Sequence, residues 1–193
     1  MTKKSSEAQV YSLKITLKGS KPPVWRRVYV SSDSTLADLH DIIQIVMDWD
    51  DSHLHEFKIA GKRFSARNMM GDDFYSDVED EGKVPLSWAE KMQPEFSYVY
   101  DFGDYWEHQI HIEGIVPADT IINMPLPYCV KGKRASPPED CGGIGGYDGI
   151  LDALADPSNK KHKEILEWSG YFDPEYFDFQ GVNRRIGEYF KSR

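Results

Sequence analysis

The sequence predicts an α+β protein with a mainly antiparallel, β-grasp-like sheet, one packed central helix and further C-terminal helices. Three observations predict this class. Three of the four segments in two predicted hairpins alternate apolar and polar residues and the fourth is an aromatic run, a strongly periodic helix stands between the hairpins, and longer helical spacing returns only near residue 150. Alternation that leaves one polar face is typical of antiparallel sheets solvated on one side.

The first pair of alternating segments predicts a hairpin. Apolar side chains occupy every second position from Tyr11 to Leu17, and residues 24–30 alternate in the same way. The glycine and two prolines of residues 19–23 break the chain between them. Residues 10–30 are therefore expected to form two half-buried strands joined by an extended loop.

The central helix is predicted over residues 35–47. Thr35 followed by Asp38 resembles a capping box, and apolar residues then recur at helical spacing as far as Met47. A turn at residues 48–52 and an alternating strand at His53–Ile59 should follow, ending at Gly61.

The second half of the chain is predicted less regularly. Residues 96–100 and 106–114 read as a second hairpin around an Asp-Phe-Gly-Asp turn. We expect a long acidic loop at 67–82, a short helix at 85–92 and mostly irregular structure at 117–149. Two helices separated at Asp156-Pro157 and a last helix at about 183–190 should cover another part of the sheet.

Composition limits the possible functions. The 193 residues carry 23 Lys and Arg against 32 Asp and Glu, a net charge of −9, which repels a phosphate backbone, so we expect no binding to duplex nucleic acid. No apolar run is long enough for a membrane span, and two cysteines are too few for a disulfide scaffold. We expect a cytoplasmic protein without a membrane partner, with a flexible segment at 1–8 and a single domain at 9–193.

Five ordered motifs carry a resemblance to a known family. They are Pro23-Val-Trp-Arg-Arg, Asp51-Ser-His-Leu-His-Glu-Phe, Tyr100-Asp-Phe-Gly-Asp-Tyr-Trp-Glu-His, Pro137-Pro-Glu-Asp-Cys-Gly-Gly and Phe172-Asp-Pro-Glu. From about residue 10 to residue 186 the chain resembles the plasmid pRiA4b ORF-3-like family, some members of which carry the label of an insertion-element passenger protein of TnpR type. The resemblance implies a plasmid or mobile-element association and no particular activity.

The TnpR label invites a resolvase interpretation, which the residues do not favour. A serine recombinase needs a nucleophilic serine among positioned arginines and a basic DNA-binding region. Ser31, Ser32 and Ser34 have no adjacent base, and the C-terminal third lacks a helix-turn-helix with a basic recognition helix. Recombination is therefore not expected.

The second predicted hairpin carries the candidate catalytic residues. Its turn should bring Asp101 and Asp104 together, with His108 on the strand that leaves it. Carboxylates and imidazole can hold a divalent metal or transfer protons. In the alternative interpretation, which we favour, the carboxylates accept hydrogen bonds from turn amides and His108 packs beside Trp106.

A second metal candidate is the pair His53 and His55. Side chains two residues apart on a strand share a face at roughly 6.6 Å, a spacing that zinc ligands can use. Cys129 and Cys141 could complete such a site, but eleven residues separate them and no common zinc motif has that spacing. A divalent metal is therefore an open possibility and structural zinc an unfavoured one.

The segment Pro137–Gly143 is the leading candidate binding surface. Two prolines stiffen its entry, and its glycines permit positive φ angles and close approach of a partner. We expect it to be ordered, to pack near the turn at 101–108, and to bind a protein or small molecule. The predicted binding residues are Glu139, Asp140, Gly142, Gly143, Trp25 and Arg26. In the alternative interpretation the loop is a structural clamp in which Asp140 caps the following turn.

Two functions of different class follow. The first is a non-catalytic binding or adaptor module that uses the Pro137–Gly143 surface. The second is a metal-dependent enzyme that uses Asp101, Asp104 and His108, together with His55. Trp25, Trp49, Trp88 and Trp106 could line an aromatic groove in either case, but tryptophans more often belong to the core.

Overall fold

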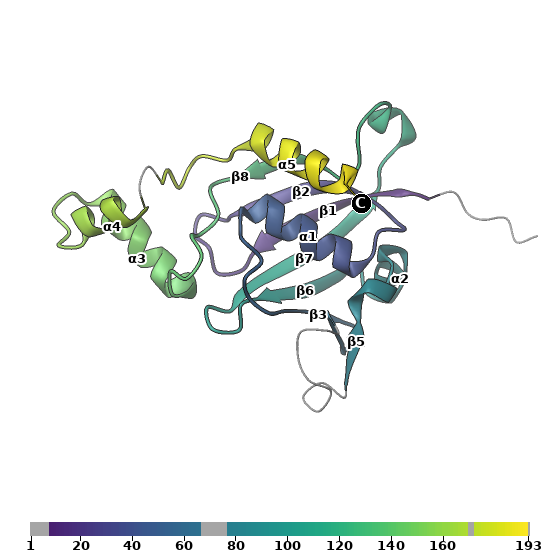
Figure 1. Cartoon of the computed structure of the whole chain (residues 1–193), viewed down its shortest axis with the longest axis horizontal. Coiled ribbons are helices and arrows are strands. Elements are labelled where there is room, and N and C mark those ends of the chain that lie inside the picture. Colours follow the sequence, from purple (N-terminus) through teal and green to yellow (C-terminus); the bar gives the residue numbers. More distant parts are fainter. Residues whose placement is uncertain (1–7, 67–76, 170–171, 193) are drawn as a thin grey trace, which may run out of the picture.

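The computed structural model describes residues 8–66, 77–169 and 172–192. The sheet has eight strands in the order β5-β4-β3-β6-β7-β1-β2-β8 (Figure 1). The strands are β1 Val10–Leu17, β2 Trp25–Ser31, β3 His55–Ile59, β4 Lys62–Ser65, β5 Val78–Asp80, β6 Glu95–Tyr100, β7 Trp106–Ile115 and β8 Tyr128–Lys133. All neighbours are antiparallel except β4 and β5. The predicted α+β class with a mainly antiparallel sheet is confirmed.

Both predicted hairpins form. Tyr11 pairs with Val30 and Thr16 with Trp25 across β1 and β2, and Tyr100 pairs with Trp106 across β6 and β7. The central pair β1 and β7 then joins the two hairpins. Leu13, Ile15 and Leu17 on β1 are fully or almost fully buried while the intervening residues are half-exposed, as the alternation predicts.

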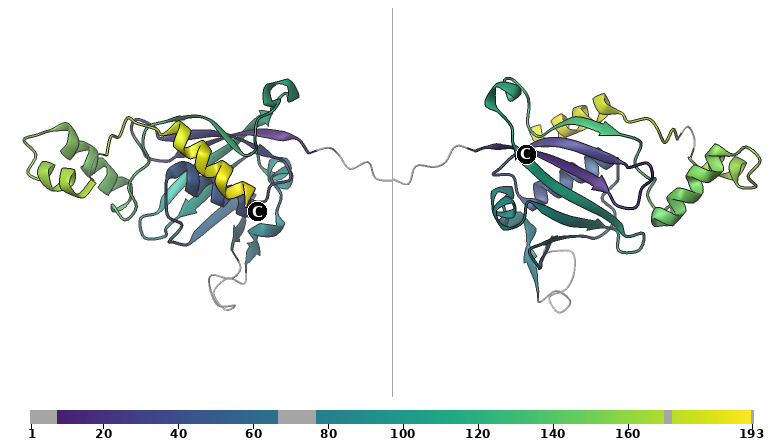
Figure 2. Two further views of the ribbon diagram at one scale, coloured as in Figure 1. Left: turned by 45° about the horizontal axis from the view of Figure 1, so that its top comes forward. Right: turned by 180° about the vertical axis from the view of Figure 1, so that it is seen from behind.

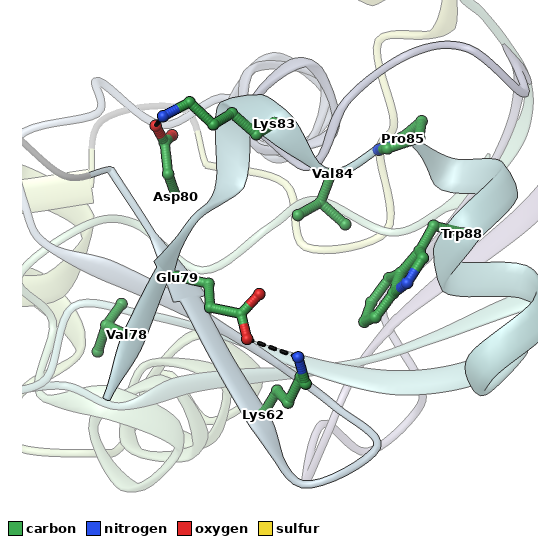
Figure 3. Close-up of a pocket in the computed structure, with 8 residues that line it drawn as sticks. All are labelled: Lys62, Val78, Glu79, Asp80, Lys83, Val84, Pro85 and Trp88. Atoms are coloured by element: carbon green, nitrogen blue, oxygen red, sulfur yellow. Dashed lines mark hydrogen bonds and ion pairs between the residues drawn. The ribbon is translucent and has the colours of Figure 1, made fainter. Parts of the chain in front are cut away.

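The far edge of the sheet contains elements that the sequence did not reveal. The strand at β3 begins at His55 rather than His53, β4 follows it, and Val78–Asp80 pairs in parallel with β4. A 3-10 turn, η1 (Glu81–Lys83), leads to α2 (Leu86–Met92), which confirms the short helix. Figure 3 shows Lys62 of β4 paired with Glu79 of β5 beside Trp88. The predicted acidic loop is therefore wrong at 78–82, and residues 67–76 lie outside the described residues.

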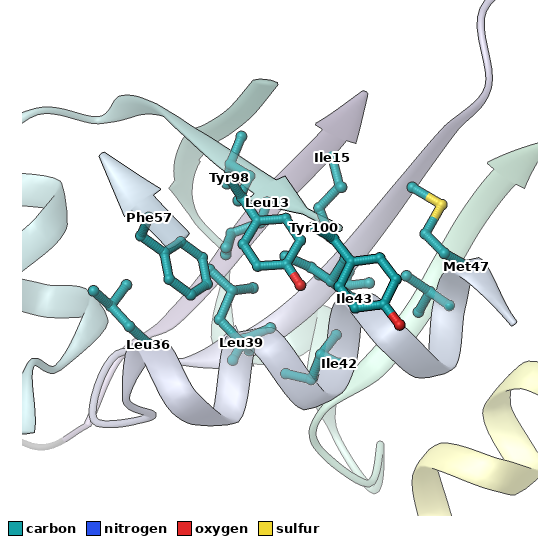
Figure 4. Packing of buried hydrophobic residues seen from close by; sticks show 14 of the residues in the cluster. Leu13, Ile15, Leu36, Leu39, Ile42, Ile43, Met47, Phe57, Tyr98 and Tyr100 are labelled. Atoms are coloured by element: carbon teal, nitrogen blue, oxygen red, sulfur yellow. The ribbon is translucent and has the colours of Figure 1, made fainter. Parts of the chain in front are cut away.

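Helix α1 (Leu36–Met47) covers the middle of the sheet. Its predicted capping box is present: the Asp38 amide donates to Thr35 Oγ1 at 3.1 Å, and the Thr35 amide donates to Asp38 Oδ2 at 2.8 Å. The apolar face from Leu36 to Met47 is fully buried against aromatic rings of the sheet, including Phe57, Tyr98 and Tyr100 (Figure 4). The predicted packing of one central helix on the sheet is confirmed.

The C-terminal helices divide between two places. Helix α5 (Phe179–Lys191) lies beside α1 on the same face of the sheet, whereas α3 (Gly143–Ala155) and α4 (His162–Ser169) project beyond the end of the sheet (Figures 1 and 2). Only α5 thus bears out the expected covering of the sheet. Its Val182 and Ile186 are buried, while Leu166 and Trp168 of α4 are exposed. An apolar face wide enough to reach the core is what places α5 there.

The region 117–149 is more regular than predicted. It contains the 3-10 turn η2 (Ala118–Ile121), the edge strand β8 and the start of α3 within the glycine cluster. Strand β8 has little apolar alternation, and α5 holds it. The Cys129 amide donates to Asn183 Oδ1 at 2.8 Å, and Asn183 Nδ2 donates to the Cys129 carbonyl at 2.9 Å. This pair of bonds occupies backbone groups that an edge strand would otherwise expose.

No helix among the described residues is long and apolar enough to cross a membrane.

Candidate functional site

Three segments far apart in the sequence meet at one end of the sheet: the turn 49–54 after α1, the turn 101–104 between β6 and β7, and the loop 137–143 before α3. We call this place the junction. Three side-chain contacts tie the loop to it. Trp49 Nε1–H donates to the Pro137 carbonyl at 2.9 Å, the Tyr100 hydroxyl donates to Glu139 Oε1 at 2.6 Å, and the Asp50 amide donates to Glu139 Oε2 at 2.9 Å. Both oxygens of Glu139 are therefore engaged inside the protein.

The end of the loop is closed by Asp104. Its Oδ2 accepts a hydrogen bond from the Gly142 amide at 3.0 Å, immediately before α3. Gly142 and Gly143 have φ angles of 92° and 66°, and a β-carbon on Gly143 would lie 2.4 Å from the Asp104 carbonyl oxygen. Only glycine fits here without a shift of the backbone. The predicted packing of the loop against the Asp101–Asp104 turn and the positive φ angles of its glycines are thus present in the structure.

The predicted capping role of Asp140 is wrong. Its carboxylate is 76% exposed, and α3 begins at Gly143 after the N-cap residue Gly142, which provides no side-chain cap. Asp140 has a φ of 56° and turns its side chain toward His53, whose Nε2 lies 3.2 Å from Asp140 Oδ1. The acceptor at the start of α3 is Asp104, which the fold supplies from a different hairpin.

His53 stands between two carboxylates. Its Nδ1 lies 4.0 Å from Asp101 Oδ1, on the side opposite to the Asp140 contact. Asp101 also accepts a hydrogen bond from the Gly103 amide at 2.8 Å, which is the turn role that the alternative interpretation gave it. One nitrogen of His53 and one oxygen each of Asp101 and Asp140 lie within 4.8 Å of one another.

His108 does not join Asp101 and Asp104. It is fully buried under α1, in edge contact with the Trp49 ring and near Tyr98. Within residues 8–66, 77–169 and 172–192, neither ring nitrogen has a partner with hydrogen-bond geometry. Burial lowers the pKa of His108 to about 3, and the nearby backbone of Trp106 and Tyr98 opposes this only in part. The packing interpretation of His108 agrees with this placement, and the three-residue catalytic set is not assembled.

His53 and His55 also separate. His55 is buried on β3, where its Nε2 lies 2.8 Å from Glu81 Oε2 and its ring stacks on His40 at 3.5 Å between centroids. They do not share a strand face because the strand begins only at His55. His40, in turn, contacts the Tyr98 hydroxyl through Nδ1 at 2.8 Å and Asp51 through Nε2 at 2.9 Å.

Trp25 and Arg26 are adjacent on β2 and therefore face opposite sides of the sheet. Trp25 lies on the solvated side, with Lys14 and Arg27 over its ring. Arg26 is buried, donates to the Val46 and Lys133 carbonyls and to Ser136 Oγ, and lies 4.0 Å from the Phe177 ring. Burial lowers the pKa of Arg26 to about 10. The two residues cannot contact one ligand together.

Two concavities adjoin the junction. A cavity of about 330 Å³ is lined by residues 51–54 and 101–103, including His53 and Asp101. A groove of about 490 Å³ lies between the C-terminal end of α1, the Pro137 end of the loop, and α5 with the segment before it. A third cavity of about 460 Å³, drawn in Figure 3, lies far from the junction, and its Lys62 and Lys83 pair with Glu79 and Asp80.

The two cysteines are free and separate. Burial raises the pKa of Cys129 to about 11, and burial with the Asp104 and Asp140 carboxylates raises the pKa of Cys141 to about 12. Cys141 belongs to the junction, while Cys129 is held by Asn183 on β8. They form no common metal site.

Several site residues escaped sequence reasoning. His40, Glu81 and Tyr100 carry buried polar contacts of the junction and its surroundings, and the groove uses the segment at residues 172–178. A histidine at a buried position of a predicted helix, as His40 is, was the available signal. The groove had none, because it exists only where α5 meets the loop.

Comparison with known proteins agrees with the motifs. Residues 9–181 match the family described as plasmid pRiA4b ORF-3-like protein. The chain is 37% identical over 186 residues to the uncharacterized protein y4hQ of Sinorhizobium fredii, covering 94% of this chain and 92% of the relative. It is also similar to the crystal structure of MM3350, a protein of unknown function from Methanosarcina mazei, with a TM-score of 0.81 and 38% identity, covering 91% of this chain and 98% of that one. The chain belongs to the plasmid pRiA4b ORF-3-like family.

Proposed function

We propose that this protein is a binding module that holds a protein or small-molecule ligand in the groove beside the loop Pro137–Gly143. One observation carries the proposal. The loop is fixed from behind by Trp49, Tyr100 and Asp104, yet its Pro137–Pro138 end forms a wall of the groove. A surface that is held rigid before binding loses little conformational entropy when a ligand arrives.

The chemistry of the groove favours an apolar or aromatic group on the ligand. Its lining combines Met47, Pro138, Phe172 and Tyr176, and the Tyr176 side chain is 61% exposed. The charged groups around it are already paired or hydrogen-bonded: Arg185 pairs with Asp48 at 2.9 Å, and Arg26 donates to backbone carbonyls and Ser136. The Asp173 and Asp178 carboxylates each accept a backbone amide at 2.9 Å. Contacts that remain for a ligand are therefore mainly apolar, as in most ligand pockets.

The test uses 1-anilinonaphthalene-8-sulfonate as a probe of apolar sites. We expect saturable fluorescence enhancement with the wild type and at least about tenfold weaker binding with Tyr176→Ser, since an aromatic wall residue of this kind carries much of the contact energy. Tyr105→Ser is the matched control, because Tyr105 is 50% exposed and lines a different surface. Equal probe binding in the Tyr176 and Tyr105 variants, or no saturable binding at all, would refute the groove as the ligand site.

A second candidate function is metal-dependent chemistry. Its predicted residue set must change, because His108 is in the core, but His53, Asp101 and Asp140 converge beside a cavity open to solvent. A metal held there could bind a water molecule and lower its pKa, which would generate a nucleophile near neutral pH. A hydrolysis assay of the metal-loaded protein distinguishes the binding function from the catalytic one. Only an enzyme would turn over a substrate, of whatever hydrolysable class.

The remaining predictions about partners and location rest on the sequence. We propose that the protein does not bind duplex DNA, because its net charge of −9 opposes counterion release. Salt-sensitive binding of a DNA duplex in a titration at about 0.15 M salt would contradict this. A cytoplasmic location and a plasmid or mobile-element association stay predictions.

A further inference from the structure

We propose that His53, Asp101 and Asp140 form a binding site for one divalent first-row metal ion. The site is separate from the proposed groove, because it uses the Asp140 side of the loop rather than Pro138, and it is the metal site on which the second candidate function rests. It joins one residue from each segment of the junction, so the site exists only when the three segments are docked.

The geometry fits one ion. Two metal–ligand bonds of about 2.1 Å place their ligand atoms roughly 3.0 Å apart at a right angle and 4.2 Å apart when opposite. His53 Nε2 lies 3.2 Å from Asp140 Oδ1, whereas the 4.0 Å contact of Asp101 Oδ1 is with Nδ1 of the same ring. One atom from each residue falls within 4.8 Å of the others, so a single ring nitrogen can serve as the ligand once the two carboxylates close toward it.

Apart from Asp140, the described residues supply no partner for His53 Nε2. This atom is shielded from solvent and makes no hydrogen bond with them, although a carboxylate oxygen stands next to it. A neutral imidazole has one N–H and can satisfy only one of the two carboxylates. A metal ion at Nε2 would use the nitrogen lone pair and neutralise the facing Asp140 oxygen.

The charge around the site also favours a cation. Asp51, Asp101 and His53 line the adjoining cavity, and none of its lining residues in the described part of the chain is Lys or Arg. Glu139 and Asp104 approach the same junction from the loop and the second hairpin. Carboxylates gathered without basic residues produce a negative potential that raises the local cation concentration.

The neighbouring group of His40, Asp51 and His55 is a weaker metal candidate. Both nitrogens of His40 and one of His55 already contact Tyr98, Asp51 and Glu81. The two rings are stacked within 10° of parallel. Because imidazole lone pairs lie in the ring plane, parallel stacked rings cannot both point at one ion without repacking the core.

The donor set selects the class of ion. Carboxylate oxygens suit Mn²⁺ and Mg²⁺, whereas imidazole suits Zn²⁺, Fe²⁺ and Ni²⁺. A mixed set of one nitrogen and two oxygens is therefore expected to prefer Mn²⁺ or Zn²⁺ over Mg²⁺ and Ca²⁺. Asp140 is 76% exposed, which leaves coordination positions open to water on that side.

The test titrates tag-free, chelator-treated protein with Mn²⁺ and Zn²⁺. The variants are His53→Gln and Asp140→Asn, and asparagine is chosen because it tolerates the φ of 56° at this position. The matched control is Asp148→Asn, which removes the same charge from an exposed position on α3. Thermal melts without metal establish that each variant is folded.

We expect saturable binding of one Mn²⁺ per chain by electron paramagnetic resonance. His53→Gln and Asp140→Asn should each weaken it by about tenfold or more, the loss typical of disturbing a metal site, while Asp148→Asn leaves it unchanged. Electron spin-echo modulation from one imidazole nitrogen should appear in the wild type and vanish in His53→Gln. No saturable Mn²⁺ or Zn²⁺ binding up to about 1 mM, which corresponds to only about 4 kcal/mol of binding free energy, would overturn the proposal. Unchanged binding in both site variants would also overturn it, as would loss in His40→Gln with retention in His53→Gln.

Discussion

Because of His108, the free energy of unfolding should fall as the pH is lowered, and substitution of His108 should remove this part of the pH dependence. The ring is fully buried, neither of its nitrogens makes a well-formed hydrogen bond with the described residues, and burial lowers its pKa from 6.5 to about 3 against the weaker effect of the Trp106 and Tyr98 backbone. The unfolded chain therefore takes up a proton at this site below about pH 6.5, while the native state stays neutral until about pH 3. Because the pKa of the folded state is depressed, the contribution is complete above pH 6.5 and is lost as the pH falls between these two values.

The size of the loss follows from the difference in bound protons. At pH 5.0 the unfolded-state histidine is about 1.5 units below its pKa, and each unit is worth about 1.36 kcal/mol, so His108 lowers the free energy of unfolding by about 2 kcal/mol relative to pH 7.5. His108→Leu keeps a similar volume and removes the titration. His111→Leu is the control, since His111 lies on the same strand but is exposed.

Urea unfolding at pH 7.5, 6.0 and 5.0 measures the effect. Between pH 7.5 and 5.0 the wild type and the His111 variant should lose about 2 kcal/mol more stability than the His108 variant. The absolute stability of His108→Leu does not enter the comparison, because only the change with pH is read. Parallel pH profiles for wild type and His108→Leu would refute the reasoning and would mean that the buried ring finds a proton acceptor or water in the native state.

Four further predictions test other parts of the structure, three by urea unfolding of variants and one by thiol labelling of the wild type. Gly146→Ala should lower the free energy of unfolding by more than about 2 kcal/mol, because its β-carbon would meet the Cys141 carbonyl oxygen at 1.7 Å. The β-carbon of Gly145→Ala has open space, so this substitution should stabilise α3 by about 0.5–1 kcal/mol. Equal effects of the two substitutions would contradict the packing. Asp104→Ala removes the acceptor before α3 and should cost about 1 kcal/mol, and an unchanged midpoint would show that the contact contributes nothing. Asn183→Ala leaves the Cys129 amide and carbonyl on the edge of β8 without their partner and should lower the free energy of unfolding by about 1–3 kcal/mol. A loss of stability no larger than that for substitution of an exposed α5 residue would contradict this role of Asn183. The Cys129 and Cys141 thiols should react with a disulfide reagent at pH 7.5 at least about tenfold more slowly in the native than in the unfolded protein, because burial raises the pKa of both. Rapid labelling of the native protein would contradict this.

Local sequence patterns were sufficient to predict the secondary-structure elements that are determined by residues close together in the sequence. The capping box at Thr35, the alternation of β1, β2 and β7 and the aromatic run of β6 each depend on residues a few positions apart, and each is present in the structure. Strands β4, β5 and β8 were missed because their side chains show no clear period. Their pairing is decided by neighbours in the sheet and, for β8, by Asn183 of α5.

The candidate site shows the same division. The sequence identified Asp101, Asp104 and the loop as polar or stiff features of turns and His53 as a strand residue, and the structure brings all of them to one junction. It grouped His108 with the aspartates because they are close in sequence, but strand direction carries that ring into the core. It grouped His53 with His55 as alternate strand positions. The strand begins only at His55, however, and His53 belongs to the preceding turn, which directs its side chain elsewhere.

The sequence by itself determined the class of fold, the central helix and the two hairpins, because hydrophobic periodicity, caps and turn residues act over short distances. Its five ordered motifs, by their resemblance to known sequences, identified the family. Only the tertiary structure decided which side chains share a site. His53, Asp101 and Asp140 come from segments separated by almost forty residues or more, and their convergence depends on how α1, the second hairpin and the loop dock on one another. That docking is set by burial of the aromatic core and by single contacts such as Trp49 to the Pro137 carbonyl, which no local pattern encodes.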